Sequence, residues 1–159
     1  MKTLVVYFSR KGYAKKLAEE AAARENADLL RLETSERTAG LLGFMWCGRF
    51  GMHRWEMPIK PYETDVSAYD RVIVVSPVWV FSVCAPVRAF LHQEKGRIRQ
   101  VEYVLVHFSF PMRYTRTRAM MDALCGCTAT RMESVVCQLG HVLRRREYAA
   151  QGSQNVGMG

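Results

Sequence analysis

The fold is decided by the stretch Leu4-Val5-Val6-Tyr7-Phe8-Ser9-Arg10-Lys11-Gly12-Tyr13-Ala14. Its first five residues form a continuous apolar run, which is typical of a strand buried on both faces of a parallel sheet. From residue 12 to residue 24 the apolar residues recur at helical spacing, with charged residues between them, so we predict a helix there. A short loop between such a strand and such a helix indicates the start of a β-α-β unit.

The rest of the chain continues to alternate strands and helices. We predict further strands at residues 28–33, 71–76, 101–108 and 132–138, and further helices at residues 38–49, 83–93, 115–124 and 141–150. This alternation predicts an α/β fold with a parallel sheet, right-handed crossovers and helices on both faces. We expect one domain over residues 1–150 and a flexible tail over residues 151–159.

Composition and charge exclude several classes of protein. The net charge is +8, but the basic residues are scattered and no zinc-finger or RNP-like signature accompanies them, so we expect no nucleic-acid partner. No apolar run reaches the roughly 18 residues of a membrane span. The N-terminal apolar run leads into Ser9-Arg10-Lys11-Gly12 without a cleavage site, so we expect no signal peptide and a cytoplasmic protein.

The chain has five cysteines, an odd number, and without an export signal we expect reduced thiols. The close pair Cys125-Gly126-Cys127 could be a redox or metal pair, or two small residues that close a helix around a glycine. We favour the helix end, because structural metal sites normally need four ligands.

Three strand ends are the candidate positions for chemistry, because open doubly wound sheets bind ligands at the carboxyl ends of their strands. The first is residues 9–14, between a strand and a helix. Backbone N–H groups and the helix dipole there could bind a phosphate, with Ser9 as a hydroxyl donor and Arg10 and Lys11 as positive charges. The alternative is a plain loop whose Ser9 caps the helix.

The other two strand ends are rich in aromatic residues. In residues 76–81, Trp79 or Phe81 could stack on a planar ring, or these rings could simply cover the end of the sheet. Residues 107–114 carry His107, which by itself is more often structural than catalytic. No Ser/His/Asp or Cys/His arrangement supports hydrolysis, so we expect any cofactor here to bring its own redox chemistry.

Residues 38–62 do not fit the alternating pattern. The segment is too aromatic for a solvated linker, and we predict a helix at residues 38–49 followed by an irregular loop. Its Trp46 and Trp55 could form a lid over a ligand, a core patch or the contact of a homodimer.

The chain resembles the flavodoxin-like family over residues 1 to about 140. The matching features are the strand and loop of residues 4–12, the strand and loop of residues 69–79, the helix with Ala85-Pro86-Val87-Arg88-Ala89-Phe90-Leu91, and the segment from Gly40 to Gly51. The resemblance implies a three-layer sandwich with a five-stranded parallel sheet in the order 2-1-3-4-5, the order that flavodoxin itself exemplifies.

The resemblance also implies FMN, with its phosphate at residues 9–14 and its ring between the loops after the third and fourth strands. The residues it implies for FMN binding are Ser9, Arg10, Lys11, Gly12, Tyr13, Ala14, Pro77, Val78, Trp79, Val80, Phe81, Ser109, Phe110 and Tyr114. This sequence differs from the family pattern at these loops, with Lys11, Tyr13 and Ala14 in the phosphate loop and bulky residues at 80–81 and 110–112.

Two hypotheses for function follow. The first is an FMN-binding protein that acts in electron transfer or as a small flavin-dependent oxidoreductase, with a redox partner protein or a small molecule as its substrate. Flavodoxins that shuttle electrons are typically acidic, so a charge of +8 favours the oxidoreductase. The second is a binding module that has kept the fold and lost FMN, with Tyr13, Phe81 and Phe110 filling the space of the cofactor.

Overall fold

The structure, a computed structural model, describes residues 1–10, 12–79, 82–107, 114–138 and 141–148. Its centre is a sheet that contains five parallel strands: β1 (Thr3–Tyr7), β2 (Asp28–Arg31), β3 (Arg71–Trp79), β5 (Val101–His107) and β6 (Arg131–Gln138). Their order across the sheet is β2-β1-β3-β5-β6, which confirms the predicted order 2-1-3-4-5. The apolar runs therefore predict the central strands correctly.

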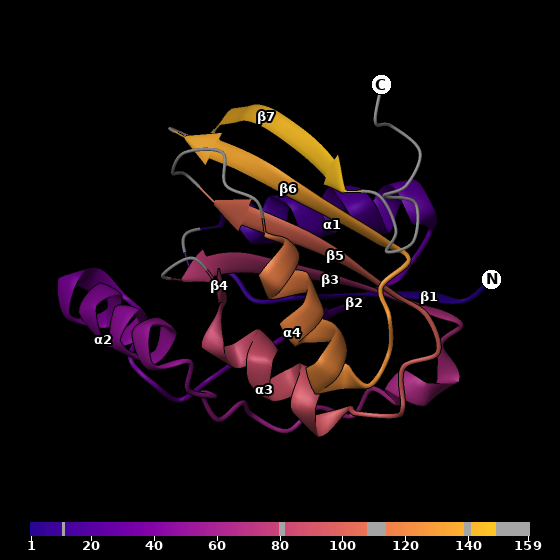
Figure 1. The fold of residues 1–159 in the computed structure, drawn as a ribbon, viewed down its shortest axis with the longest axis horizontal. Helices are drawn as coiled ribbons and strands as arrows, with labels where there is room; N and C mark the ends of the chain where they lie inside the picture. The colour runs from indigo at the N-terminus through magenta and orange to yellow at the C-terminus, as the bar shows by residue number, and fades with distance from the viewer. Residues whose placement is uncertain (11, 80–81, 108–113, 139–140, 149–159) are drawn as a thin grey trace.

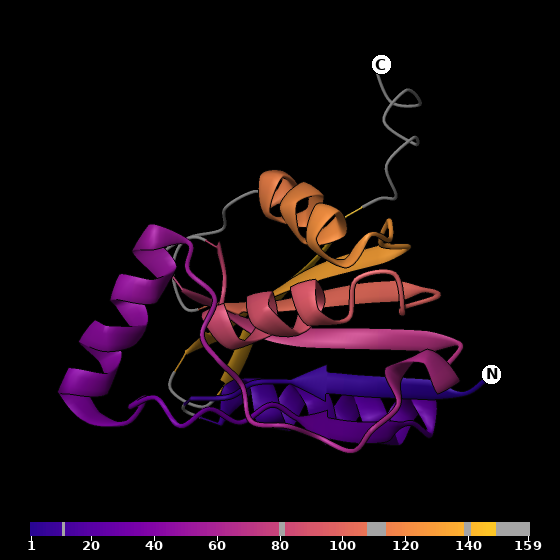
Figure 2. The same ribbon diagram turned by 90° about the horizontal axis from the view of Figure 1, so that it is seen from below.

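The helices form two outer layers, as Figures 1 and 2 show. Helix α1 (Tyr13–Glu25) covers one face, while α3 (Ala85–Gln93) and α4 (Thr115–Cys125) cover the other. Because alternate residues of a strand point to opposite faces, Val5 packs with α1 while Leu4 and Val6 pack in the core under α3 and α4. The predicted three-layer sandwich is confirmed.

Helix α1 illustrates why these segments fold as they do. Its buried side chains recur at helical spacing and are all small or aliphatic: Ala14, Leu17, Ala18, Ala21 and Ala22. Small side chains let the helix lie close to the sheet, and the charged residues between them remain outside. The helix ends at Asn26, whose left-handed conformation (φ 49°) is typical of a helix C-terminus.

The prediction for residues 141–150 is wrong. The structure places β7 (His141–Tyr148) there, antiparallel to β6 at the edge of the sheet. Two charged residues of β7 form cross-strand ion pairs with β6: Arg145 with Glu133 at 3.0 Å, and Glu147 with Arg131. Tertiary contacts have overridden local propensity, as sheet edges often require a partner. A second antiparallel strand, the two-residue β4 (Ser82–Val83), pairs with the end of β3.

Helix α2 (Gly40–His53) lies after β2, close to the helix predicted at residues 38–49. Its start needs a glycine, because a Cβ on Gly43 would lie 2.4 Å from the carbonyl carbon of Thr38. Both ribbon views show α2 at one extremity of the molecule, apart from the other helices. A 3₁₀ turn (Val66–Ala68) then leads into β3.

Two smaller predictions have clear outcomes. Helix α4 ends at Gly126 with φ 71°, so Cys125-Gly126-Cys127 closes a helix as favoured. All five cysteines are free. Of the helices in the described part of the chain, none combines the length and apolar composition that crossing a membrane requires.

Candidate functional site

A cavity of about 580 Å³ lies at the carboxyl ends of the parallel strands. This volume is within the range of roughly 300–1,000 Å³ that is usual for small-molecule and cofactor sites. β1 and β3 are adjacent in the sheet, and the chain order reverses between them, which is where ligands bind in open α/β sheets. The described residues that line it are Ser9, Arg10, Tyr13, Ala14, Phe44, Cys47, Gly48, Pro77, Val78, Trp79, Val106, His107, Cys137 and Gln138.

The first side of the cavity is the N-terminus of α1. Gly12 occupies the N-cap position with φ 97°, a conformation that side chains other than glycine rarely adopt. The Ser9 hydroxyl accepts a hydrogen bond from the Gly12 N–H at 2.9 Å. The first turn of α1 has no side-chain cap and no acidic residue. No carboxylate in the first turn would therefore repel an anion bound at the positive end of the helix dipole.

Arg10, in the loop after β1, also contacts α2 and the residues before it. Its guanidinium lies 5.2 Å from the centre of the Phe44 ring and donates a hydrogen bond to the Thr38 carbonyl oxygen at 3.3 Å. Arg10 thus joins the loop after β1 to α2. Among the described lining residues it is also the only one with a permanent charge, so the cavity is weakly positive.

The second side is the end of β3, where Pro77, Val78 and Trp79 line the cavity. Trp79 is buried rather than exposed, and its ring packs edge-on against Phe8 with centroids 5.7 Å apart. Trp79, one of the residues implied for FMN binding, thus lines the cavity. Its role as a stacking ring stays a prediction, and the structure shows that Trp79 also supports the core.

The third side is the end of β5, with Val106 and His107. His107 is buried, and its ring lies 5.2 Å from the ring of Tyr114. Tyr114 is buried at the start of α4 and is not among the residues that line the cavity. The other predicted residues, Lys11, Val80, Phe81, Ser109 and Phe110, lie outside the described residues.

The predicted site residues omit two further walls, although a lid from residues 38–62 was one of the alternatives. One is formed by Phe44, Cys47 and Gly48 of α2, and the other by Cys137 and Gln138 at the end of β6. The unusual aromatic content of residues 38–62 was a signal for the first. The second could have been found by extending the search to the carboxyl end of the fifth parallel strand.

The thiols in this region are neutral at physiological pH. Burial raises the pKa of Cys47 to about 11, and it also raises the pKa of Cys137. A thiol, unlike a thiolate, is a poor nucleophile and metal ligand. Within the described ranges, no group of three or more His, Cys, Asp or Glu side chains could hold a metal ion. The cavity is thus mostly apolar, with helix N–H groups and one arginine at one end.

Comparisons with known proteins agree with this architecture. No protein-family model matches the sequence, and no curated protein sequence does either. A flavoprotein of Lactobacillus acidophilus NCFM, solved in complex with FMN, superposes with a TM-score of 0.65 and 21% identity over 84% of this chain and 91% of that one. A protein of Bacteroides uniformis ATCC 8492, provisionally classed as a flavoprotein, has a TM-score of 0.71 and 16% identity over 85% and 90% of the two chains.

The strand order and these superpositions together decide the fold. The chain has the flavodoxin-like fold. A third structure, of a provisionally classed flavoprotein from Bacteroides eggerthii DSM 20697, agrees with a TM-score of 0.66 and 16% identity over 84% and 85% of the two chains. In the flavodoxin-like fold the switch point between the first and third strands is where flavodoxin holds FMN, and the cavity lies at that point.

Proposed function

We propose that this protein binds FMN in the cavity at the switch point and uses it in electron transfer or as a small oxidoreductase. One observation carries the proposal: the cavity joins an uncapped helix N-terminus to a mostly apolar interior. An anion with a large planar ring needs both features. The FMN complex of a protein with the same fold supports the choice of ligand.

The phosphate of FMN suits the loop of residues 9–14. The uncapped first turn of α1 offers backbone N–H donors, Ser9 offers a hydroxyl, and Arg10 supplies positive charge. A Cβ at Gly12 would meet nothing within 4 Å, so the loop leaves open space there. We expect Lys11 and Tyr13 in the same loop to take the place of the polar side chains usual in the family.

The ring suits the apolar walls farther in. Val78 and Trp79 at the end of β3, with Phe44 from α2, present side chains that exclude water from a planar group. We expect the loops of residues 77–81 and 108–114 to border the ring, as the resemblance to flavodoxins implies. Phe44 is half exposed and lies between the cavity and the surface, so it is well placed to cover one edge of the ring.

FMN, when bound, supplies one-electron and hydride chemistry that no side chain of the cavity provides. The chain's own residues bind it, orient it and keep water away. The described lining residues include no carboxylate and only thiols of raised pKa, so general acid–base catalysis by Asp, Glu or thiolate is not built into this part of the site. A charge of +8 favours a small-molecule substrate or an acidic redox partner. We expect the protein to act in the cytoplasm.

Fluorescence titration tests the proposal. Adding the protein to FMN should quench the flavin fluorescence with one equivalent bound and micromolar or tighter affinity. Ser9→Ala should weaken binding by about 1 kcal/mol because it removes a hydroxyl at the phosphate loop, whereas Ser67→Ala, in the 3₁₀ turn before β3, should not. The absence of quenching with wild-type protein would exclude FMN binding.

The alternative is a binding module that has lost FMN. It requires side chains to fill the space between the loops, but Tyr13 borders the cavity without closing it. Phe81 and Phe110, the other two side chains that this alternative names, lie outside the described residues. The titration separates the two hypotheses directly, because the module predicts no quenching.

A further inference from the structure

Helix α2 has an apolar surface that the fold does not cover. Its inner face buries Cys47 and Phe50, but its other sides expose apolar side chains: Leu41, Leu42, Phe44, Met45, Trp46 and Met52, followed by Trp55 just after the helix. Leu41 is 75% exposed, Met45 62% and Met52 68%. A helix that is apolar on all sides is normally buried on all sides. Exposing these seven apolar side chains to water is therefore unfavourable. We call them together the α2 surface.

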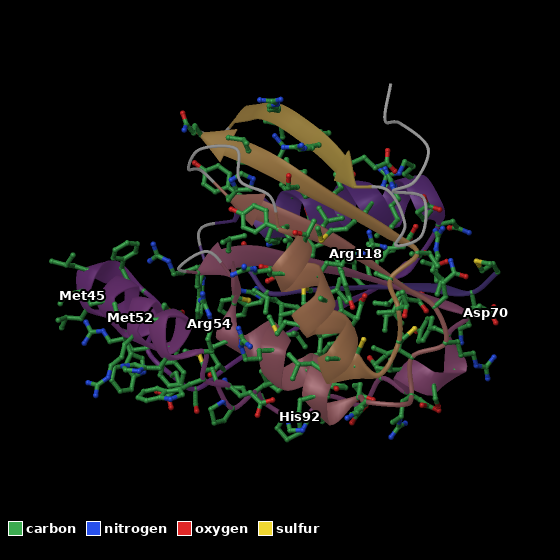
Figure 3. All side chains as sticks on the ribbon, viewed as in Figure 1. Met45, Met52, Arg54, Asp70, His92 and Arg118 are labelled. Atoms are coloured by element: carbon green, nitrogen blue, oxygen red, sulfur yellow. The ribbon has the colours of Figure 1, made fainter. Side chains whose placement is uncertain are left out.

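The α2 surface is accessible to a large flat partner. Figures 1 and 2 show α2 along one outer side of the molecule, beyond the sheet and the remaining helices. Figure 3 shows Met45 at the outer edge of this side.

Positive charges outnumber negative ones around the α2 surface. Residues 36–56 contain Arg37, Arg49 and Arg54, against Glu56 and Glu36, whose carboxylate accepts a hydrogen bond from the Trp46 indole N–H at 2.9 Å. All three arginines are exposed. The guanidinium of Arg49 lies 5.9 Å from the centre of the Trp46 ring and 5.8 Å from that of Trp55. Exposed apolar side chains with an excess of cations around them complement a surface that is apolar inside and anionic outside.

We propose that the α2 surface docks this protein on a membrane whose lipids have anionic headgroups. Interfacial helices combine Leu, Phe and Trp with Lys or Arg, and they lie in the plane of the headgroups. Each cation near an anionic leaflet adds about 1 kcal/mol of attraction. Trp46 and Trp55 are half-exposed indoles of the kind that settle at the boundary between lipid and water.

A second copy of the chain is a poorer fit to the same surface. A helix of 14 residues is about 21 Å long and offers roughly 300 Å² on one face. A stable dimer buries about 800 Å² on each partner. Two copies would also bring the excess positive charge of the two α2 surfaces together. A lipid surface has neither requirement, because it is continuous and carries its own negative charge.

Vesicle sedimentation tests the inference. The protein should sediment with vesicles of phosphatidylcholine mixed with phosphatidylglycerol, bind much less to phosphatidylcholine alone, and be released as salt is raised. Leu41→Ser should weaken partitioning by about tenfold, since it removes an inserted apolar side chain. The matched control is Leu29→Ser, because Leu29 is a half-exposed leucine on β2, away from α2.

Charge and fluorescence give two independent readouts. The double variant Arg37→Gln/Arg49→Gln should lose most binding to the anionic vesicles, while Lys95→Gln/Arg144→Gln, with the same loss of charge elsewhere, should keep it. Of the three tryptophans, two lie on the α2 surface and Trp79 is buried. Vesicles should therefore shift tryptophan emission to the blue in the wild type and not in the variant Trp46→Phe/Trp55→Phe.

Three results would overturn the proposal. One is no difference between anionic and neutral vesicles, and another is equal binding by the Leu41 and Leu29 variants. The third is a stable dimer in solution that Leu41→Ser dissociates, which would assign the surface to a second copy. These results are separate from the FMN titration, because the residues substituted in these variants are not among the described residues that line the cavity.

Discussion

Helices α1 and α2 both border the cavity, yet they place their apolar residues very differently. α1 buries a stripe of alanines and Leu17 against the sheet and exposes lysines and glutamates. α2 buries a narrower face and exposes leucines, methionines and tryptophans. The fold buries nearly all the apolar side chains of α1, with Ala23 exposed, but only part of those of α2.

This difference separates residues that stabilise the fold from residues that are available for a function. The residues of α1 are explained by packing and by the helix N-terminus that they direct at the cavity. The exposed residues of α2 contribute little to packing, so their apolar character points to a function: one side covers the cavity through Phe44, and another side is free to contact a membrane.

The largest effect should come from matched leucines on the two helices. Leu17→Ala on α1 should lower the free energy of unfolding by about 2–5 kcal/mol, because it leaves a cavity beside the sheet. Leu41→Ala on α2 should change it by less than about 0.5 kcal/mol, because that side chain is exposed. Urea unfolding followed by circular dichroism measures both. Equal losses for the two variants would show that α2 packs more fully than the structure indicates.

The next effect concerns the thiols of the cavity. Burial raises the pKa of Cys47 from an ordinary value of 9.0 to about 11, so its reactive thiolate is about a hundredfold scarcer at pH 8 than that of a free cysteine. Iodoacetamide should modify Cys47 slowly, and faster as the pH rises towards 11. Bound FMN should protect Cys47 and Cys137 further, as mass spectrometry of tryptic peptides would show.

Cys127 is the control for this experiment. It is partly exposed, follows α4 and is not among the residues that line the cavity, so FMN should leave its modification rate unchanged. Modification of Cys47 at the rate of a free cysteine would contradict the described burial. Equal protection of Cys127 would mean that FMN acts on the whole fold and not at this cavity.

A smaller effect compares neighbours within α2. Phe44→Ala should weaken FMN binding by about 1–3 kcal/mol, the scale of an aromatic side chain stacked on a base, because Phe44 lines the cavity. Met45→Ala should leave affinity unchanged, since Met45 is exposed and points away from the cavity lining. Fluorescence titration of the two variants decides whether α2 covers the ring. Equal affinities would remove α2 from the site.

The smallest effect should come from Arg10. Arg10→Ala removes the contact with the Phe44 ring and the hydrogen bond to the Thr38 carbonyl oxygen. The free energy of local unfolding of α2 should therefore fall by about 0.5–1 kcal/mol. Hydrogen exchange of α2 amides should be severalfold faster, while α1 amides remain as protected as in the wild type. Lys15→Ala, an exposed residue in the first turn of α1, provides the control. Unchanged exchange in Arg10→Ala would mean that other contacts position α2.

The central strands were predictable because each is a long apolar run, and runs such as residues 71–76 are buried on both faces. The edge was not, since residues 141–148 read locally as a basic helix. Backbone pairing with β6, together with the ion pairs to Glu133 and Arg131 on that strand, makes a strand the better solution. Local propensity contains no information about such pairs, which depend on the assembled sheet.

The same distinction holds for the cavity. The loop at Ser9 and the end of β3 at Pro77 follow directly from strands and could be found in the sequence. Cys137 lines the cavity because of the order of the strands in the sheet, and Phe44 because of the position of α2. No sequence motif encodes either arrangement. Trp79 shows a further limit, because the sequence indicated an aromatic ring but not that it packs on Phe8.

The most direct test of the central claim is the absorbance spectrum of the protein after incubation with FMN and gel filtration. The account predicts that the flavin absorbance elutes with the protein at one FMN per chain and shifts from the spectrum of free FMN. Protein that elutes colourless, with all flavin in the small-molecule fraction, would contradict FMN binding at this cavity.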